Sequence, residues 1–433
     1  MARRLNIVDA SFDRDFAAFL AQDRDDGVDV AAAVAAIVAD VRRDGFGAVE
    51  KYTKTFDKFG IDEKSVAVGA DDIDRMLSQC DPEDIKALEF AAERIRAYHE
   101  KQLPQDMRYK DDMGVTLGWR WTAVDAAGLY APGGRAAYPS SVLMNAIPAR
   151  IAGVNRLVMT TPTPRGEANP LVFAAARIAG IDEIYRIGGA QAVAALAYGA
   201  GPIAPVDVIV GPGNAYVAEA KRQVFGRVGI DSVAGPSEIL VVADGENDPA
   251  WIAADLLSQA EHDPSSQSVL ITDDAAFADA VCAAVETQLA NSPRAEIAGA
   301  AWRDNSAVIV VGALDDAAPL VDAIAPEHLE LAVADPEALL SKVRHAGAVF
   351  LGRHTPEATG DYVAGPDHVL PTARAARYAS GLSVLDFMKR TSIIGCDAQS
   401  LGAIGPAAAR LADAEGLPAH AQSIRIRLKP VDE

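Results

Sequence analysis

The chain has 433 residues, half of them hydrophobic, and a formal net charge of −21. This length is too great for a single small core, so we expect an ordinary globular protein of two or three domains. The acidic balance argues against a nucleic-acid or anionic-membrane partner, because binding to phosphates requires clustered lysine and arginine side chains.

The sequence does not predict a membrane anchor or an exported protein. Basic residues near the N-terminus are followed by no apolar run, unlike a secretory signal. The longest uncharged stretch, 187–206, contains four glycines and two prolines, which argues against a membrane span. The three cysteines, Cys80, Cys282 and Cys396, lie far apart in the sequence. They form no Cys-x-x-Cys pair, which favours a reducing cytoplasm as the location.

The first hundred residues show helical periodicity. Apolar side chains repeat at helical spacing from Val30 until Gly45, and a longer helix is predicted from Asp81-Pro82 to about Gln102. Residues 115–124 then alternate between apolar and polar side chains, which predicts a strand or the arm of a hairpin.

From residue 126 short apolar runs alternate with helical patterns. Strands are predicted at 129–131, 156–159, 183–187, 206–210, 238–243, 268–272, 307–311, 329–333 and 348–351. Helices are predicted between them at 141–152, 170–179, 190–200, 248–262, 275–289, 319–324 and 336–345. This order indicates an α/β fold of two tandem, incomplete Rossmann-like modules with parallel sheets that face a cleft. The N-terminal segment is expected to be helical, and so is a C-terminal tail after about Ser380 that ends in an alternating basic stretch, 423–429.

Two polar side chains lie near the end of the helix predicted at 248–262. Asp248-Pro249 is a favourable helix start, and Gln259 and His262 follow with a spacing of three residues. This spacing places an amide oxygen and an imidazole nitrogen on one side of the helix, about one turn apart. Two such donors could begin a metal site but could not complete it. Taken alone, the segment is more typical of a solvated histidine at a helix end.

A second weak pattern is the turn Gly211-Pro-Gly-Asn214-Ala-Tyr216, which follows a predicted strand. It resembles a dinucleotide-binding turn, with tyrosine in place of the third glycine and with Asp231 about twenty residues further on. Its N–H groups could face a phosphate at the start of a helix. An ordinary strand-to-helix turn explains this segment at least as well.

Longer stretches carry a more specific signal. Gly128-Leu-Tyr-Ala-Pro-Gly-Gly-Arg opens a stretch that ends at Ala149, and Gln259-Ala-Glu-His-Asp and Pro326-Glu-His-Leu-Glu follow later. Further such stretches lie at 230–238, 360–362, 368–372, 380–387 and 415–420. In this order, from about residue 30 to the C-terminus, they closely resemble the histidinol dehydrogenase family. The resemblance implies a zinc-containing, NAD-dependent homodimer that oxidises L-histidinol through the aldehyde to L-histidine, the last step of histidine biosynthesis.

The resemblance also implies roles for individual residues. It assigns zinc binding to Gln259, His262, Asp361 and His420, a set of nitrogen and oxygen donors that suits this metal. Glu327 and His328 correspond to the catalytic pair. His328 would be the base in both oxidations, and Glu327 would activate the water that hydrates the aldehyde.

Contacts to the substrate and to NAD follow from the same resemblance. The substrate would be held by Ser237, Gln259, His262, His328, Asp361, Glu415 and His420. NAD would contact Tyr130, Gln191 and Asn214, which follow strands of the first α/β run.

In the resembling family the tail crosses to the other subunit. Each zinc would then have three ligands from one chain, and His420 and Glu415 would serve the site of the neighbouring chain. The domains expected on this basis are an N-terminal segment 1–25, a main α/β domain 26–129 and 238–380 with the metal and catalytic residues, an NAD-binding α/β domain 130–237, and a tail 381–433 that packs on the partner.

Three other functions compete with this one. A related zinc- and NAD-dependent enzyme could oxidise another polyol, such as a sulfonated diol, but Glu415 and the two metal-site histidines favour an amino alcohol that bears an imidazole. A thiol-dependent aldehyde dehydrogenase needs a reactive cysteine, and only Cys396 lies near one of the matching stretches. A zinc-stabilised scaffold or binding protein would not reduce NAD when histidinol is added.

Overall fold

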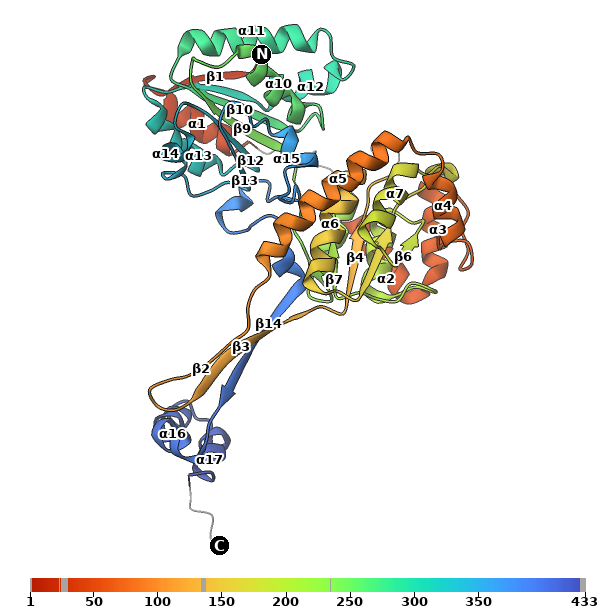
Figure 1. Cartoon of the computed structure of the whole chain (residues 1–433), viewed down its shortest axis with the longest axis vertical. Coiled ribbons are helices and arrows are strands. Elements are labelled where there is room, and N and C mark those ends of the chain that lie inside the picture. The colour runs from red at the N-terminus through yellow and green to blue at the C-terminus, as the bar shows by residue number, and fades with distance from the viewer. Residues whose placement is uncertain (1, 23, 25–29, 134–137, 234, 429–433) are drawn as a thin grey trace.

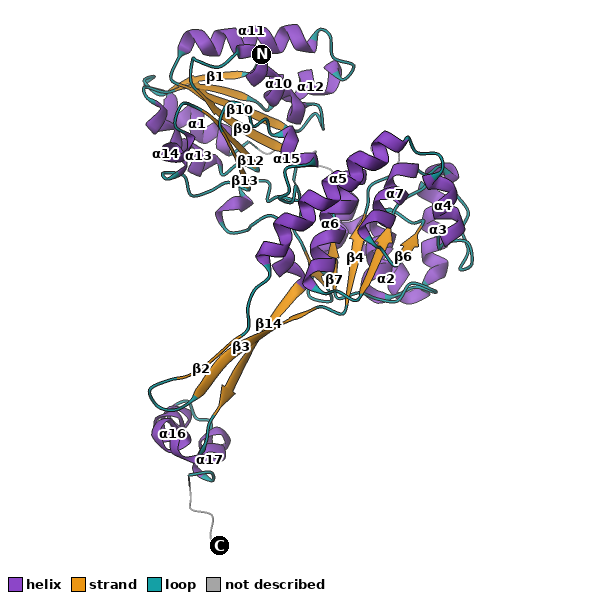
Figure 2. Cartoon of the chain, in the orientation of Figure 1, coloured by secondary structure: helices purple, strands orange, loops and turns teal. Residues whose placement is uncertain are grey.

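The structure is a computed structural model that describes residues 2–22, 24, 30–133, 138–233 and 235–428. Residues 134–137 of the stretch 128–149 and Lys429 of the basic tail lie outside the described residues. Two α/β modules lie next to each other, and a long arm leads away from them to the C-terminal helices (Figure 1). The expected pair of modules with parallel sheets is confirmed, as the strands in Figure 2 show.

The first module is built on a six-stranded parallel sheet. Its strands lie in the order β1 (Arg3–Asn6), β11 (Ala307–Val310), β10 (Gln267–Thr272), β9 (Glu238–Ala243), β12 (His328–Ala332) and β13 (Ala348–Leu351). One face is covered by α1 (Phe12–Leu20), α13 (Ala317–Ile324) and α14 (Pro336–Leu340), and the other by α10 (Pro249–Ala260), α11 (Ala275–Leu289) and α12 (Ala295–Asp304). Every side chain of the central strands β9, β10 and β12 is buried, as is usual for a parallel sheet covered on both faces.

The second module contains a five-stranded parallel sheet. Its strands lie in the order β6 (Glu183–Tyr185), β5 (Arg156–Thr160), β4 (Ala126–Tyr130), β7 (Val208–Val210) and β8 (Gly229–Ile230). One face is covered by α2 (Ala31–Asp44), α3 (Phe46–Phe56), α8 (Gly189–Tyr198) and α9 (Ala215–Val224). The other is covered by α4 (Ala70–Leu77), α5 (Pro82–His99), α6 (Pro139–Ala152) and α7 (Pro170–Ala179).

Helices α2 to α5 pack on the five-stranded sheet. From the sequence we expected residues 26–129 to belong to the other module, so this part of the domain prediction is wrong. Their periodicity indicates that one face of each helix is buried, but it contains no information on the sheet that buries it. Conversely, β1 joins the edge of the six-stranded sheet beside β11, so the segment before residue 25 is part of that module.

The arm is an antiparallel sheet in the order β14 (Met388–Gly395), β3 (Thr116–Ala123) and β2 (Met107–Lys110). At its far end α16 (Ala398–Ala414) and α17 (Pro418–Arg425) pack on each other around a few alanines (Figure 1). The strand expected at 115–124 is confirmed, but the tail after Ser380 is not wholly helical, because β14 is a strand. The first residues of the alternating basic stretch, 423–425, lie in α17.

Other elements lie close to the positions that the sequence predicts. The strands at 238–243 and 348–351 and the helices at 170–179 and 275–289 have the expected bounds, whereas the helix expected at 336–345 ends at Leu340. Short 3₁₀ helices occupy 100–102, 164–166, 314–316, 375–377 and 384–387. Among the described helices, none is long and apolar enough to cross a membrane.

Candidate active site

The end of α10 brings two of the expected residues to the amino edge of the six-stranded sheet. Asp248 caps the helix by accepting a hydrogen bond from the Ala250 N–H at 2.8 Å, as expected. Gln259 in the last turn is 1% exposed, and both atoms of its amide group are buried without a hydrogen-bond partner among the described residues. His262 lies just beyond, with Nδ1 3.3 Å from Oγ of Ser237. Ser237 immediately precedes β9, so these three side chains meet at one edge of the sheet.

Glu327 and His328 lie at the same edge, where β12 begins. The His328 ring is buried, and its Nδ1 donates a hydrogen bond to the main-chain oxygen of Glu238 at 2.8 Å. Because a carbonyl oxygen can only accept, Nδ1 carries the proton and Nε2 is the free basic atom. Nε2 is buried, and the described residues offer it no hydrogen-bond partner. Burial lowers the pKa of His328 and raises that of Glu327, so the neutral imidazole is favoured.

Helix α15 (Ala358–Tyr362) supplies Asp361 and follows Glu357. Nε2 of His328 lies 3.5 Å from Oε1 of Glu357 and 4.0 Å from Oδ1 of Asp361. Burial, together with the charge of Glu357 and a hydrogen bond that protonated Asp361 donates to Glu357, raises the pKa of Asp361 to about 8. Carboxylates that are crowded in this way without a cation favour protonation, and a bound cation would reverse that preference.

The residues present fit a zinc ion. The amide of Gln259 is buried and unpartnered within the described chain, and such an arrangement costs free energy unless a ligand satisfies it. The His262 side chain is exposed in the single chain. Partial desolvation lowers the pKa of its imidazole, and the negative charge of Glu357 raises that pKa and so opposes the desolvation effect. Ligand atoms of His328, Glu357 and Asp361 lie within 4.8 Å of one another. Only Asp361 belongs both to this group and to the ligand set that the resemblance implies.

The expected NAD residues lie at the carboxyl edge of the five-stranded sheet. Tyr130 ends β4, and its hydroxyl oxygen accepts a hydrogen bond from the Gly189 N–H at 3.0 Å. Gln191 in the first turn of α8 is 1% exposed, and its Oε1 is buried with no partner in the described part of the chain. Asn214 caps α9 by accepting from the N–H groups of Tyr216 and Val217 at 3.1 and 3.2 Å. The Gln191 oxygen thus lacks a hydrogen-bond partner within the described residues.

The turn at Gly211 is a tight strand-to-helix connection. Gly211 has φ +115°, and a Cβ there would lie 2.3 Å from the main-chain oxygen of Tyr130, so glycine is required. Asp231 is the residue at the spacing of a ribose-binding acid, but it accepts a hydrogen bond from the Gly211 N–H at 2.7 Å and forms a buried ion pair with Lys221. Asp231 therefore holds the turn together and does not face a ribose.

The remaining two expected residues do not join the site in the single chain. Glu415 directly follows α16 and His420 lies in α17, and these two helices stand at the far end of the arm, well away from both modules (Figure 1). Six of the eight residues expected at the metal and catalytic centre therefore come together, namely Ser237, Gln259, His262, Glu327, His328 and Asp361.

Three residues of this region were not predicted from the sequence, namely Glu238, Glu357 and His368. His368 joins the two modules, since Nδ1 donates to the main-chain oxygen of Asp361 at 2.9 Å and Nε2 lies 3.0 Å from Oγ of Ser141 on α6. Burial lowers the pKa of His368 to about 4, so this bridge is neutral at physiological pH. Its position in a matching stretch, 368–372, was the only sequence signal for it.

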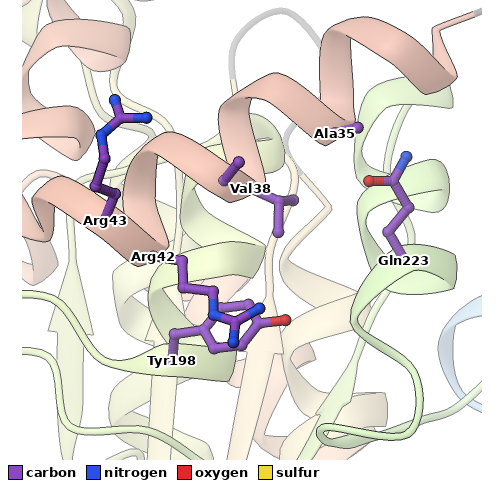
Figure 3. A pocket seen from close by; sticks show the side chains of 7 residues that line it. Ala35, Val38, Arg42, Arg43, Tyr198 and Gln223 are labelled. Carbon is purple, nitrogen blue, oxygen red and sulfur yellow. The ribbon is translucent and has the colours of Figure 1, made fainter.

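A further depression is lined by residues of α2, α8 and α9. It measures about 390 Å³ and is lined by Ala35, Val38, Ala39, Arg42, Arg43, Tyr198 and Gln223 (Figure 3). The guanidinium of Arg42 lies 5.5 Å from the centre of the Tyr198 ring. This depression contains none of the expected site residues.

Comparison with known proteins agrees with the geometry. A sequence model of the histidinol dehydrogenase family matches residues 20–428. The histidinol dehydrogenase of Rhodospirillum rubrum is 63% identical over 99% of both chains, and that of Rhizobium meliloti is 60% identical over the full length of both. The solved structure of histidinol dehydrogenase from Elizabethkingia anophelis has a TM-score of 0.94 and 34% identity, and the match covers 100% of this chain and 99% of that one.

These matches support histidinol as the substrate over another polyol, because the full-length relatives share one activity. The reaction uses zinc and NAD, and its substrate is L-histidinol. The chain thus belongs to the histidinol dehydrogenase family, the zinc- and NAD-dependent oxidoreductases that convert L-histidinol through L-histidinaldehyde to L-histidine in the final step of histidine biosynthesis.

Proposed function

We propose that His328 is the base of both oxidations and that Glu327 activates the water that hydrates the aldehyde. The observation that carries this proposal is the buried, unpartnered Nε2 of His328, whose protonation state is determined by the hydrogen bond from Nδ1 to a main-chain oxygen. A neutral imidazole with a free nitrogen at the site is suited to accept a hydroxyl proton.

Zinc would be held by Gln259, His262 and Asp361 of one chain and by His420 of the partner subunit. The partner subunit's Glu415 would complete the substrate pocket together with Ser237. When bound, zinc would hold the imidazole and amino nitrogens of the substrate, and NAD would supply the hydride acceptor for each oxidation. Tyr130, Gln191 and Asn214 would contact NAD. Support for this comes from the free amide oxygen of Gln191 and from the carboxyl edge that all three share, where parallel sheets bind such ligands.

The roles of the chain's residues follow from the proton balance of the reaction. In the first oxidation Nε2 of His328 takes the hydroxyl proton while a hydride leaves the carbon that bears this hydroxyl. His328 then releases its proton to solvent. Glu327 removes a proton from water as the water oxygen bonds to the aldehyde carbon, which forms the monoanion of the hydrate. His328 takes the remaining hydroxyl proton of this anion in the second oxidation, while the second hydride leaves and the carboxylate forms. The sum consumes one water and two NAD and yields L-histidine, two NADH and three protons.

We further infer that the protein is a cytoplasmic homodimer with shared active sites. Support comes from the arm, which holds Glu415 and His420 away from the modules of their own chain (Figure 1). Exposed apolar side chains along it, including Met107, Ile394 and Leu411, would be covered by a second copy. In this assignment the NAD domain is built on the five-stranded sheet, the metal and catalytic domain on the six-stranded sheet, and 381–433 is the tail.

The test is an absorbance assay for NADH with histidinol and with histidinal, before and after chelation and after zinc is added back. We expect both substrates to yield NADH, chelation to abolish turnover, and zinc to restore it. A protein that turns over both substrates fully after its metal has been removed would contradict the assigned metal site.

A further inference from the structure

A buried glutamate that has no assigned role contacts both catalytic residues. Glu238 begins β9 and is 3% exposed. Its main-chain oxygen accepts the hydrogen bond from Nδ1 of His328 at 2.8 Å, and its N–H donates to Oε2 of Glu327 at 2.9 Å. The parallel register of β9 and β12, in which Ile239 lies opposite His328, brings these groups together.

The side chain of Glu238 also contacts the main chain of Glu327. Oε2 of Glu238 accepts a hydrogen bond from the N–H of Glu327 at 3.3 Å, so the two glutamates bind each other reciprocally. Oε1 accepts from the N–H of Ala373 at 3.0 Å and from the guanidinium of Arg24. Arg24 is itself largely buried and neutralises a charge that would otherwise be costly at this depth.

We propose that Glu238 is a positioning residue for both steps of the reaction and divides this task between its main chain and its carboxylate. The main-chain oxygen fixes the tautomer of His328, and no substitution of residue 238 removes that oxygen. The carboxylate, held by Arg24, fixes the main chain of Glu327 and thereby the direction of the water-activating side chain. Loss of the carboxylate should therefore impair the step that needs water more than the step that needs only the base.

L-Histidinal allows the two steps to be compared with one substrate. With NAD it is hydrated and oxidised, which requires Glu327, and with NADH it is reduced to histidinol, which requires no water. The ratio of the two rates for Glu238→Gln is the readout, because general loss of structure lowers both rates together. We expect the ratio to fall about tenfold, the size of a lost hydrogen bond to a charged group, with kcat rather than KM of the oxidation affected.

Asp244→Asn is the matched control, since Asp244 follows the opposite end of β9. It pairs with Arg353 at 2.7 Å and accepts a hydrogen bond from Ala334 beyond β12, so it resembles Glu238 without touching the catalytic pair. The control should keep the wild-type ratio. Glu238→Gln leaves the buried Arg24 without its ion-pair partner and could therefore fail to fold. In that case the double variant Arg24→Met/Glu238→Gln, which lacks this unpaired cation, is measured instead, and we expect the same fall in the ratio.

This inference rests on the proposed role of Glu327, so Glu327→Gln is measured in parallel. A fall in the ratio for Glu327→Gln but not for either Glu238 variant would overturn the positioning role and leave the role of Glu327 intact. An unchanged ratio for Glu327→Gln would overturn both, since Glu238 would then have no water-activating group to position.

Discussion

Oγ of Ser141 lies 3.0 Å from Nε2 of His368, and this hydrogen bond joins the five-stranded module to the edge that carries the catalytic residues. Nδ1 of the same ring donates to the main chain of Asp361, so His368 links α6 to α15. Replacing Ser141 by alanine should loosen the relative position of the two modules. A hydrogen bond of this kind contributes about 0.5–1.5 kcal/mol, so kcat/KM should fall roughly two- to tenfold. Ser268→Ala is the control, because its Oγ bonds within one module, to Leu256 O at 2.6 Å.

Substitution of the catalytic pair should separate the two half-reactions. His328→Asn should suppress both oxidations by about a hundredfold or more, because both need the base. Glu327→Gln should spare the oxidation of alcohol to aldehyde more than the oxidation of aldehyde to acid. Single-turnover formation of NADH from histidinol and from histidinal measures each step. Equal losses in the two steps for Glu327→Gln would argue against its role with water.

Shared metal sites predict that two inactive proteins restore activity when they are mixed. His262→Ala and His420→Ala should each be inactive alone. In the mixed dimer one site lacks both ligands and the other is complete, so random exchange should give about a quarter of the wild-type activity. The mixture is assayed after mass spectrometry has verified that subunits have exchanged. No recovery would mean that each chain supplies all of its own ligands.

A buried acid pair predicts a pH-dependent change in stability. Burial, together with Asp255, raises the pKa of Glu330 to about 9, and burial raises that of Asp255 to about 6. A raised carboxyl pKa means that the folded state retains its proton more strongly. Stability is therefore lost as pH rises from the ordinary carboxyl range towards 9. Glu330→Gln should raise the unfolding temperature relative to wild type at pH 8.5 and have little effect at pH 5. The same shift at both pH values would contradict this explanation.

We expect that the exposed thiol of Cys396 is not needed for oxidation of the aldehyde. Cys396 lies just beyond β14, at the far end of the arm. Cys396→Ser should leave both oxidations unchanged in the NADH assay, since water activated by Glu327 is the proposed nucleophile. A selective loss of aldehyde oxidation would support a thiol-dependent mechanism.

Buried elements were predicted well because burial leaves a pattern in the sequence. The strand at 238–243 and the helix at 275–289 have the predicted bounds, and their apolar side chains repeat with the periods of a covered strand and an amphipathic helix. β14 was missed because most of its side chains are exposed, including Lys389 and Arg390, so it has no apolar face. The edge strand β1 was missed as well, because it is short and has only one buried residue, Leu5, so it shows no strand periodicity.

In the candidate site, too, local relationships could be predicted from the sequence and long-range contacts could not. Gln259 and His262 could be recognised as a local pair because a helix fixes their relative position. Glu238 and Glu357 could not, because their contacts with Glu327 and His328 depend on sheet register and on a loop that returns from far along the chain. His368 meets Ser141 only through the packing of two modules, which no local periodicity encodes.

The two sheets meet at opposite edges, and this gives the two sides of the site opposite electrostatic character. Helices α6, α8 and α9 begin at the carboxyl edge of the five-stranded sheet, so their N-termini direct partial positive charge at the side proposed for the dinucleotide phosphates. Helix α10 instead ends at the amino edge of the six-stranded sheet, beside Gln259, and directs partial negative charge at the side proposed for the metal. The main-chain dipoles thus favour an anionic cofactor on one side of the site and a cation on the other, independently of the side chains.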